Sequence, residues 1–311
     1  DTDGDGIADA RTVLLTGLYS PFGMAFANGE LFVANADGIV AYRFQPGQTK
    51  LDVRPRHITA LPSGYNHHWT KSLVASPDGK FLFVGVGSNS NAGENGLEME
   101  QGRAAVWMID ARTGAYRIFA SGLRNPVGIA WNPWSRNLWV VVNERDELGD
   151  NLVPDYLTSV KDGAFYGWPW SYYGNHVDAR VKPARPDMVA KAIAPDFALG
   201  PHVAPLGLAF SAGQALGPRF AQGAFVGEHG SWNRSEANGY QVVFVPFAGG
   251  HPSARPVPIA LTRNSTAAIF MTESRPIRSA SRPAVTAPSA APSRAEATAK
   301  PSAVFPMPKS S

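Results

Sequence analysis

The chain has 311 residues, of which 44% are hydrophobic and 11% aromatic. This apolar content is enough for a large buried core and excludes a chain that is disordered throughout. The absence of cysteine excludes thiolate catalysis, cysteine-based zinc sites and disulfide bonds. No stretch has the roughly 18 to 20 uncharged apolar residues that a membrane-spanning helix needs.

The net charge of +3 is unevenly distributed along the chain. Residues 263–311 contain seven Lys or Arg and two Glu, a net charge of +5, so residues 1–262 carry −2. A mildly acidic body with charges of both signs lacks the basic surface that binds a phosphate backbone. We therefore expect no nucleic-acid partner.

The first 14 residues form an acidic segment with none of the apolar core of a signal peptide. Asp1, Asp3, Asp5 and Asp9 have the spacing of the first half of an EF-hand calcium loop. Thr12 stands where that loop has its bidentate glutamate. A weak structural Ca²⁺ site and a plain acidic turn are therefore equally consistent with this segment.

A short β pattern recurs between residues 15 and 262. The unit Gly-x-Ala-aromatic occurs at 23–26, 128–131 and 207–210, with a relaxed form at 72–75. A second apolar strand follows each unit at 31–34, 81–85, 138–141 and 224–227, and a third closes it at 38–42, 105–109 and 240–245. Turns such as Asn28-Gly29 between such strands predict β-hairpins.

Repeats of three or four strands, spaced roughly 50 to 80 residues apart, are typical of propeller blades. Small Gly and Ala residues suit the inner strands, which crowd the central axis. We predict an all-β protein with about four propeller blades in residues 15–262. A β-sandwich would explain the strands but not the recurring unit.

Residues 263–311 have a different composition. All 31 glycines precede residue 263, and Ala, Pro and Ser make up 27 of the 49 residues that follow. Such a segment buries too little apolar surface to offset the entropy cost of ordering it. We predict a disordered, low-complexity basic tail.

Several loop motifs resemble the pyrroloquinoline quinone (PQQ)-dependent soluble sugar dehydrogenases, and most closely their L-sorbosone dehydrogenase branch. The motifs lie at residues 68–73, 122–130, 143–152, 166–170, 203–207 and 227–234. The resemblance implies a six-bladed propeller with PQQ and Ca²⁺ at the mouth of a central channel. Two of the six blades would then be absent: one before Asp1, and one that residues 263–311 should supply but do not resemble.

The resemblance also implies roles for individual residues. PQQ has three carboxylates and an ortho-quinone, so its site needs fixed cations and a group that polarises the reactive carbonyl. These roles are implied for Arg124, which activates the carbonyl, and Asn125. His68 is implied as the general base that takes the substrate's hydroxyl proton, with His67 as its rival. Further cofactor contacts are implied for Arg234, His229 and His202.

Calcium is implied at backbone carbonyls of Glu144, Arg145 and Asp146, where the family has Gly-Pro in place of Arg145-Asp146. A carbonyl ligand has no side-chain signature in the sequence.

The leading interpretation is a PQQ- and Ca²⁺-dependent dehydrogenase, periplasmic or secreted, that oxidises an aldose or a sorbosone-like sugar aldehyde. Its electrons would pass to an acceptor such as a quinone or a cytochrome. One alternative is a lactonase-like metal-dependent hydrolase, with Asn143, Asp150 and Glu228 as ligands. The other is a non-catalytic propeller that binds partners through its loops. A requirement for PQQ would separate the first interpretation from both alternatives.

Overall fold

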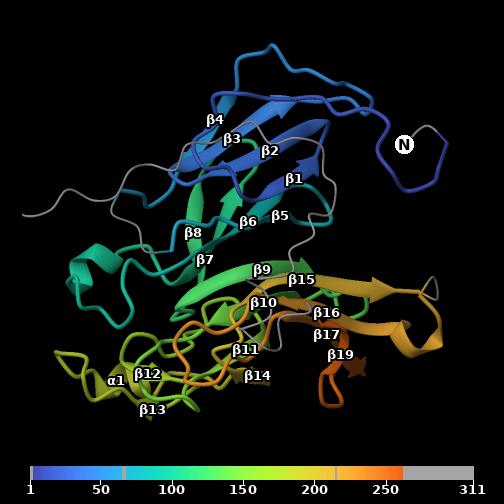
Figure 1. Cartoon of the computed structure of the whole chain (residues 1–311). Coiled ribbons are helices and arrows are strands. Elements are labelled where there is room, and N and C mark those ends of the chain that lie inside the picture. Colours follow the sequence, from blue (N-terminus) through green and yellow to red (C-terminus); the bar gives the residue numbers. More distant parts are fainter. Residues whose placement is uncertain (1–2, 65–67, 214–215, 262–311) are drawn as a thin grey trace, which may run out of the picture. The chain divides into compact units, whose positions relative to one another are not determined.

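The computed structural model describes residues 3–64, 68–213 and 216–261 (Figure 1). These residues belong to one compact unit, Asp1–Thr272. The tail predicted for residues 263–311 lies outside the described residues, as do Asp1 and His67. Nearly all secondary-structure elements of the described part are β-strands, which confirms the predicted all-β class.

Four antiparallel sheets follow one another along the chain. The first contains β1 (Met24–Ala27), β2 (Glu30–Asn35), β3 (Gly38–Arg43) and β4 (Arg56–Ala60). The second contains β5 (Leu73–Ala75), β6 (Phe81–Val86), β7 (Ala105–Asp110) and β8 (Tyr116–Ser121). The third contains β9 (Asn125–Trp131), β10 (Leu138–Asn143), β11 (Pro154–Ser159) and β14 (Phe197–Pro201). The fourth contains β15 (Pro205–Ala212), β16 (Gln222–Glu228) and β17 (Gln241–Ala248), with β18 (His251–Pro252) and β19 (Val257–Leu261) both paired to β17.

The predicted hairpin turns are confirmed where the sequence is clearest. Ala27 of β1 pairs with Glu30 of β2, so Asn28 and Gly29 are the two turn residues. Both have positive φ, 53° and 74°, as a type I′ turn requires. This conformation matches the right-handed twist of the two flanking strands.

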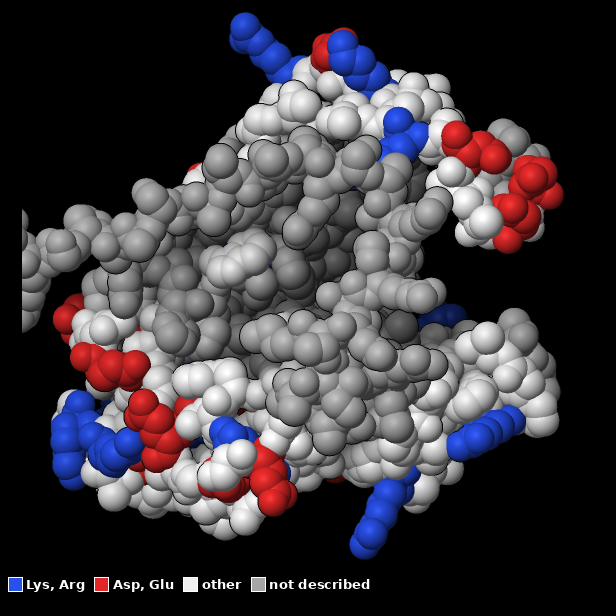
Figure 2. All heavy atoms as spheres, viewed as in Figure 1, with Lys and Arg blue, Asp and Glu red and all other residues white. Residues whose placement is uncertain are grey.

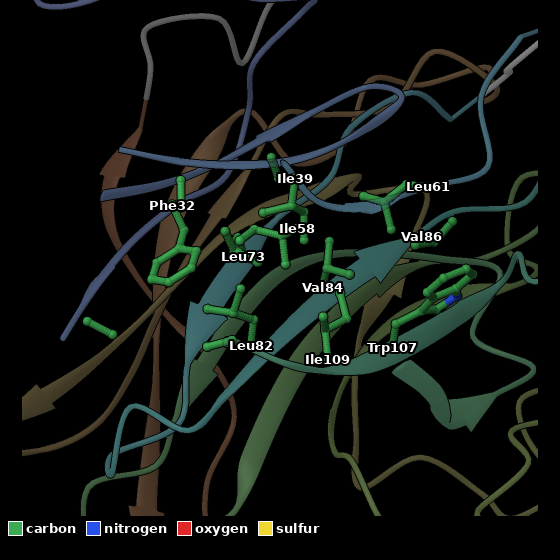
Figure 3. Packing of buried hydrophobic residues seen from close by; sticks show 14 of the residues in the cluster. Phe32, Ile39, Ile58, Leu61, Leu73, Leu82, Val84, Val86, Trp107 and Ile109 are labelled. Carbon is green, nitrogen blue, oxygen red and sulfur yellow. The ribbon is translucent and has the colours of Figure 1, made fainter. Parts of the chain in front are cut away.

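The cores lie between successive sheets, because side chains alternate between the two faces of each strand. The core between the first and second sheets contains Leu82, Val84 and Val86 of β6, which pack with Phe32 of β2 and Ile39 of β3 (Figure 3). The intervening Phe83 instead belongs to the core shared with the third sheet. Each inner sheet is therefore covered on both faces, as a propeller blade is.

Two glycines, in β6 and β9, lie where neighbouring sheets approach each other closely. A Cβ on Gly85 would overlap the carbonyl oxygen of Pro126 in β9 of the next sheet. A Cβ on Gly128 would lie 2.8 Å from the backbone nitrogen of Leu208 in β15. Glycine at these positions lets the backbones of neighbouring sheets approach each other.

Several elements were not predicted from the sequence. Each sheet has an outer strand beyond the recurring pattern, namely β4, β8, β14 and β19, and β11 supplies the third strand of the third sheet. Between β11 and β14 lie the short hairpin β12 (Ser171–Tyr172) and β13 (His176–Val177) and the single-turn helix α1 (Pro186–Val189). Two 3₁₀ turns, η1 (Leu97–Glu100) and η2 (Pro218–Phe220), complete the described elements.

Charged side chains of both signs are interspersed on the face shown in Figure 2. Among the described residues, no helix is long and apolar enough to cross a membrane.

Candidate active site

A cavity of about 350 Å³ gathers polar side chains from the loops at one end of the strands. Its walls are formed by His68, Arg124, Asn125, Asn143, Glu144, Asp146, Asp155, His202, Ala204 and Trp232. Six of these ten residues are site residues predicted from the sequence: His68, Arg124, Asn125, Glu144, Asp146 and His202.

Antiparallel topology explains why these residues meet. In such a sheet the start of the first strand lies beside the end of the second. Asn125, the first residue of β9, accordingly pairs with Asn143, the last residue of β10. His68 and His202 precede β5 and β15, the first strands of the second and fourth sheets, and so reach the same end.

Arg124 is almost fully buried, with 2% of its surface exposed, and its guanidinium is held by protein oxygens. Its Nη1 donates to the carbonyl oxygens of Asn143 and Glu144 at 3.3 and 2.7 Å. Its Nε and Nη2 donate to the carbonyl and side-chain oxygens of Asn91 at 3.1 and 2.9 Å. Arg124 therefore joins the loop after β6 to the loop after β10.

Asp146 lies between two nitrogen groups of the cavity wall. Its Oδ2 is 3.2 Å from Nη2 of Arg124, and its Oδ1 is 3.3 Å from Nδ1 of His202. Nε2 of His202 lies 3.0 Å from the carbonyl oxygen of Gly149, an acceptor, and therefore carries a hydrogen. Arg124, Asp146 and His202 thus form one continuous set of contacts along the cavity wall.

The hydrogen-bond network assigns the tautomer of His68. Its Nδ1 lies 3.0 Å from both the carbonyl oxygen and Oγ of Ser88. The hydroxyl of Ser88 donates its single hydrogen to the carbonyl oxygen of Ser90 at 2.6 Å. Both Ser88 atoms therefore act as acceptors, so Nδ1 carries the proton and Nε2 is the basic nitrogen.

Two carboxyl groups in the wall have strongly raised pKa values. Burial raises the pKa of Glu144 to about 8, against the opposing effect of Arg124. Burial likewise raises the pKa of Asp155 to about 8, although it accepts backbone hydrogen bonds from Glu144 and Ala204, each at 2.7 Å. Both groups are therefore mostly neutral at pH 7.

Two oxygens of the cavity residues have no hydrogen-bond partner in the described part of the chain. They are Oε1 of Glu144 and Oδ1 of Asn125, and both are buried. Gly87 leaves the space beside Asn125, because a Cβ there would lie 2.5 Å from both Asn125 Oδ1 and the Cβ of His68. Unpartnered buried polar atoms beside a cavity are typical of a site that binds a polar ligand.

Other residues predicted from the sequence do not line the cavity. Arg145 is fully buried and forms an ion pair with Asp178, behind the wall. His229 is exposed, and its backbone nitrogen donates to the Ala204 carbonyl oxygen at 2.9 Å. Arg234 lies on the loop that supplies Trp232, and its buried Nε has no hydrogen-bond partner among the described residues.

Among the described residues of the predicted N-terminal calcium loop, two carboxylates act as turn acceptors. Asp3 and Asp5 each accept a hydrogen bond from the backbone nitrogen two residues later, as acidic turns do. Within residues 3–64, 68–213 and 216–261, no three His, Cys, Asp or Glu side chains converge as ligands for a metal ion. Of the residues required by the hydrolase alternative, Asn143 lines the cavity, whereas Asp150 accepts from Ser235 and Glu228 accepts from Gln241.

Sequence reasoning assigned no role to Ser88, Asp155, Trp232 or Lys71. Lys71 is completely buried behind His68, and its Nζ donates to the carbonyl oxygen of Trp69 at 3.0 Å. Burial lowers the pKa of Lys71 to about 7, and the positive charge of Arg103 contributes in the same direction. Lys71 and Trp232 lie within the recognised motifs, so those motifs were the signal that could have found them.

A family model described as TrAA12-like matches residues 3–157 and 182–286 of the chain. The match continues past residue 262, where the predicted tail begins.

Curated relatives include a sugar dehydrogenase. An uncharacterized protein of Borreliella burgdorferi is 27% identical over 248 residues, which cover 76% of this chain and 64% of that protein. The aldose sugar dehydrogenase YliI of Escherichia coli is 31% identical over 187 residues, which cover 55% of this chain and 47% of that enzyme. The chain thus spans roughly half to two thirds of the length of these relatives.

A solved structure with the same fold is the holo form of the PQQ domain of pyranose dehydrogenase from Coprinopsis cinerea. The TM-score is 0.65 at 21% identity, over 84% of this chain and 73% of that domain. Together with the four sheets, this likeness confirms the predicted propeller fold. The sequence resemblance to PQQ-dependent sugar dehydrogenases is also confirmed, whereas the L-sorbosone branch stays a prediction.

Proposed function

Because the chain belongs to the TrAA12-like family, we propose that it is a PQQ-dependent dehydrogenase that oxidises an aldose or a sorbosone-like sugar aldehyde. One observation carries this proposal: His68, Arg124, Asn125 and His202 line one cavity. They come from three segments of the chain that are far apart in the sequence, at His68, at Arg124-Asn125 and at His202, and only the fold brings these segments together.

The described residues fit PQQ in size and in chemistry. A cavity of about 350 Å³ lies within the range of small-molecule sites. Oδ1 of Asn125 is an unpartnered acceptor beside the cavity, suited to the N–H group of the cofactor's pyrrole ring, and the guanidinium of Arg234 on a neighbouring loop adds positive charge opposite the cofactor's carboxylates. Glu144 and Asp155 are mostly neutral at pH 7, so they add little repulsion toward a cofactor with three carboxylates.

Asn125 and His202 would line the cofactor's space, with Arg234 and His229 on the adjoining loop. Arg124 would hold the surrounding loops in place and add positive charge, because its five N–H groups already donate to protein oxygens. Bound PQQ would supply a quinone that accepts two electrons as hydride from the substrate carbon. The chain's own contribution is proton transfer: Nε2 of His68 takes the proton of the hydroxyl on that carbon while Ser88 holds Nδ1–H. Oxidation of a cyclic aldose would then yield a lactone, and oxidation of a hydrated aldehyde would yield an acid.

Calcium fits this set of residues less well. The carbonyl oxygens of Asn143 and Glu144 accept hydrogen bonds from Arg124, whose positive charge opposes a cation at those atoms. The chemistry proposed above therefore involves no calcium ion. The proposal also includes a periplasmic or extracellular location and a quinone or cytochrome as electron acceptor. Whether activity depends on Ca²⁺ is a question for experiment.

The test is a titration of the chain with PQQ, with and without Ca²⁺, read by cofactor absorbance and by dye-linked oxidation of glucose. We expect saturable binding of one PQQ and turnover that requires it. Arg124→Lys should weaken binding at least tenfold, because lysine cannot bridge Asn91 and Glu144 as the guanidinium fork does.

The matched control is Arg117→Lys, in an exposed ion pair with Asp162, which should bind PQQ like the unchanged chain. Absence of saturable PQQ binding, or turnover that does not depend on PQQ, would overturn the proposal.

A further inference from the structure

Trp232 is an exposed indole in a cavity wall whose other residues are mostly polar or charged. Its exposed fraction is 76%, and it lies with His68 and Asn125 around the same space. Its aromatic face has no ring packed against it in the part of the chain that the structure describes. Trp69 is different, because its ring packs edge-on against Phe22 at 5.8 Å.

The backbone beneath Trp232 is firmly held. The preceding residue, Ser231, is buried and accepts a hydrogen bond from the hydroxyl of Tyr240 at 2.6 Å. Ser231 and Asn238 exchange two further hydrogen bonds across the loop, at 2.8 and 2.9 Å. Gly230 has a φ of 103°, and a Cβ there would lie 2.5 Å from the ring of Tyr240. The exposure of Trp232 is therefore not that of a loosely held loop.

The two kinds of surface around the cavity match the two kinds of surface on a sugar ring. A pyranose has an apolar face of C–H groups and an edge of hydroxyl groups. The negative face of an indole attracts the polarised C–H groups, and burial of the two apolar surfaces adds to the attraction. His68, Asn125 and Asn143 supply polar atoms for the hydroxyl edge.

We infer that Trp232 is the platform on which the substrate's sugar ring stacks, and that it gives the site its preference for cyclic sugars over small open-chain aldehydes. The expected effect of Trp232 on turnover rests on the proposed function. The expected binding of a sugar to Trp232 rests only on the geometry of this residue, so binding and turnover can be tested separately.

The binding test uses the chain without PQQ. Methyl α-D-glucopyranoside, which has no reactive anomeric hydroxyl, is titrated while tryptophan fluorescence is recorded. We expect a saturable change that is lost in Trp232→Phe and kept in Trp134→Phe, because Trp134 lies on the β9–β10 turn and packs against Phe210. No change in the unchanged chain, or the same change in Trp232→Phe, would overturn the inference.

The kinetic test uses the PQQ-loaded chain with glucose and with glycolaldehyde, which is too small to span the platform. In Trp232→Ala we expect KM for glucose to rise by about tenfold or more, the value of losing one aromatic contact and its buried area. We expect kcat for glucose and KM for glycolaldehyde to stay within about threefold. An equal rise of KM for both substrates would refute a role in ring recognition. Absence of turnover with either substrate would instead count against the proposed function, and the fluorescence test would then decide on Trp232.

Discussion

Ser88 determines which nitrogen of His68 can act as a base. The carbonyl and hydroxyl oxygens of Ser88 both accept from Nδ1, so the lone pair of the imidazole is on Nε2. The neutral imidazole is thus fixed in one tautomer before any substrate arrives. Such preorganisation is what a general base needs, because the wrong tautomer would present a hydrogen to the substrate hydroxyl.

Replacing the base should separate binding from turnover. We expect His68→Gln to bind PQQ almost normally and to lose turnover by about 10² to 10⁴, the usual value of a positioned general base. His176→Gln is the control, because His176 is exposed, stacks on Tyr172 and does not line the cavity. Stopped-flow reduction of the bound cofactor measures the loss. Normal turnover in His68→Gln would remove this histidine from the mechanism.

Lys71 should make stability depend on pH. Its pKa is about 7 when folded and 10.5 in a model lysine, so between these values the unfolded chain binds more protons. Stability should therefore rise with pH above 7 by about 1.4 kcal/mol per pH unit from this group. Below pH 7 Lys71 is protonated in both the folded and the unfolded chain, so the destabilisation that comes from burying its charge is constant.

Urea unfolding between pH 7 and 9 measures this effect against Lys71→Met. As pH rises, the free energy of unfolding of the unchanged chain should increase relative to that of Lys71→Met. Lys191→Met changes an exposed residue, and its free energy of unfolding should depend on pH as that of the unchanged chain does. Parallel curves for Lys71→Met would show that Lys71 keeps its ordinary pKa.

At the residue scale, motifs located much of the candidate site. His68, Arg124, Asn125 and His202 could be proposed because their loops resemble known ones. Ser88 and Asp155 could not, because they lie outside the recurring motifs and their contacts join segments that are distant in the sequence. Ser88, for example, meets His68 only when β6 ends beside the segment that leads into β5.

At the element scale, the close approach of neighbouring sheets depends on glycine. Gly85→Ala should lower the free energy of unfolding by about 1–3 kcal/mol, because the new Cβ meets the backbone of Pro126, which cannot move aside as a side chain could. Gly227→Ala is the control, because its Cβ would have 3.8 Å to its nearest neighbour, a backbone atom of Gly207. Guanidinium unfolding midpoints measure both, and equal midpoints would show that the sheets can separate at no cost.

The same elements explain which strands sequence patterns could predict. Buried inner strands such as β10, Leu-Trp-Val-Val-Val, are apolar throughout because both faces are covered. Outer strands such as β4 and β8 carry Arg, His or Tyr on exposed positions, and β4 pairs with β3 across a register shift. Their strand character comes from pairing with a neighbour, which the local sequence does not display.

At the scale of the described unit, the first and fourth sheets differ from the two between them. β1 carries Met24 and Phe26 with 65% and 53% of their surfaces exposed, and β15 carries Leu206 at 39%. β1 and β15 each have one face on a core between sheets, which includes Ala27 of β1 and the packed side chains of Leu208 and Phe210 of β15. Burial at these two strands depends on what lies beside the sheet rather than on the strand's own residues.

The ring of contacts around Asp146 joins segments from different repeats. Asn91 belongs to the second sheet's loop, Asp146 to the third, and His202 to the link into the fourth, with Arg124 between them. In repeat proteins each unit contacts mainly its neighbours, so in principle one repeat could be exchanged for a homologous copy. Here an exchanged repeat would have to bring a matching partner for its neighbour's charges. A functional exchange of repeats would therefore have to transfer adjacent repeats together. For the same reason, substitutions in the loops at this end of the strands must be matched by substitutions in their neighbours.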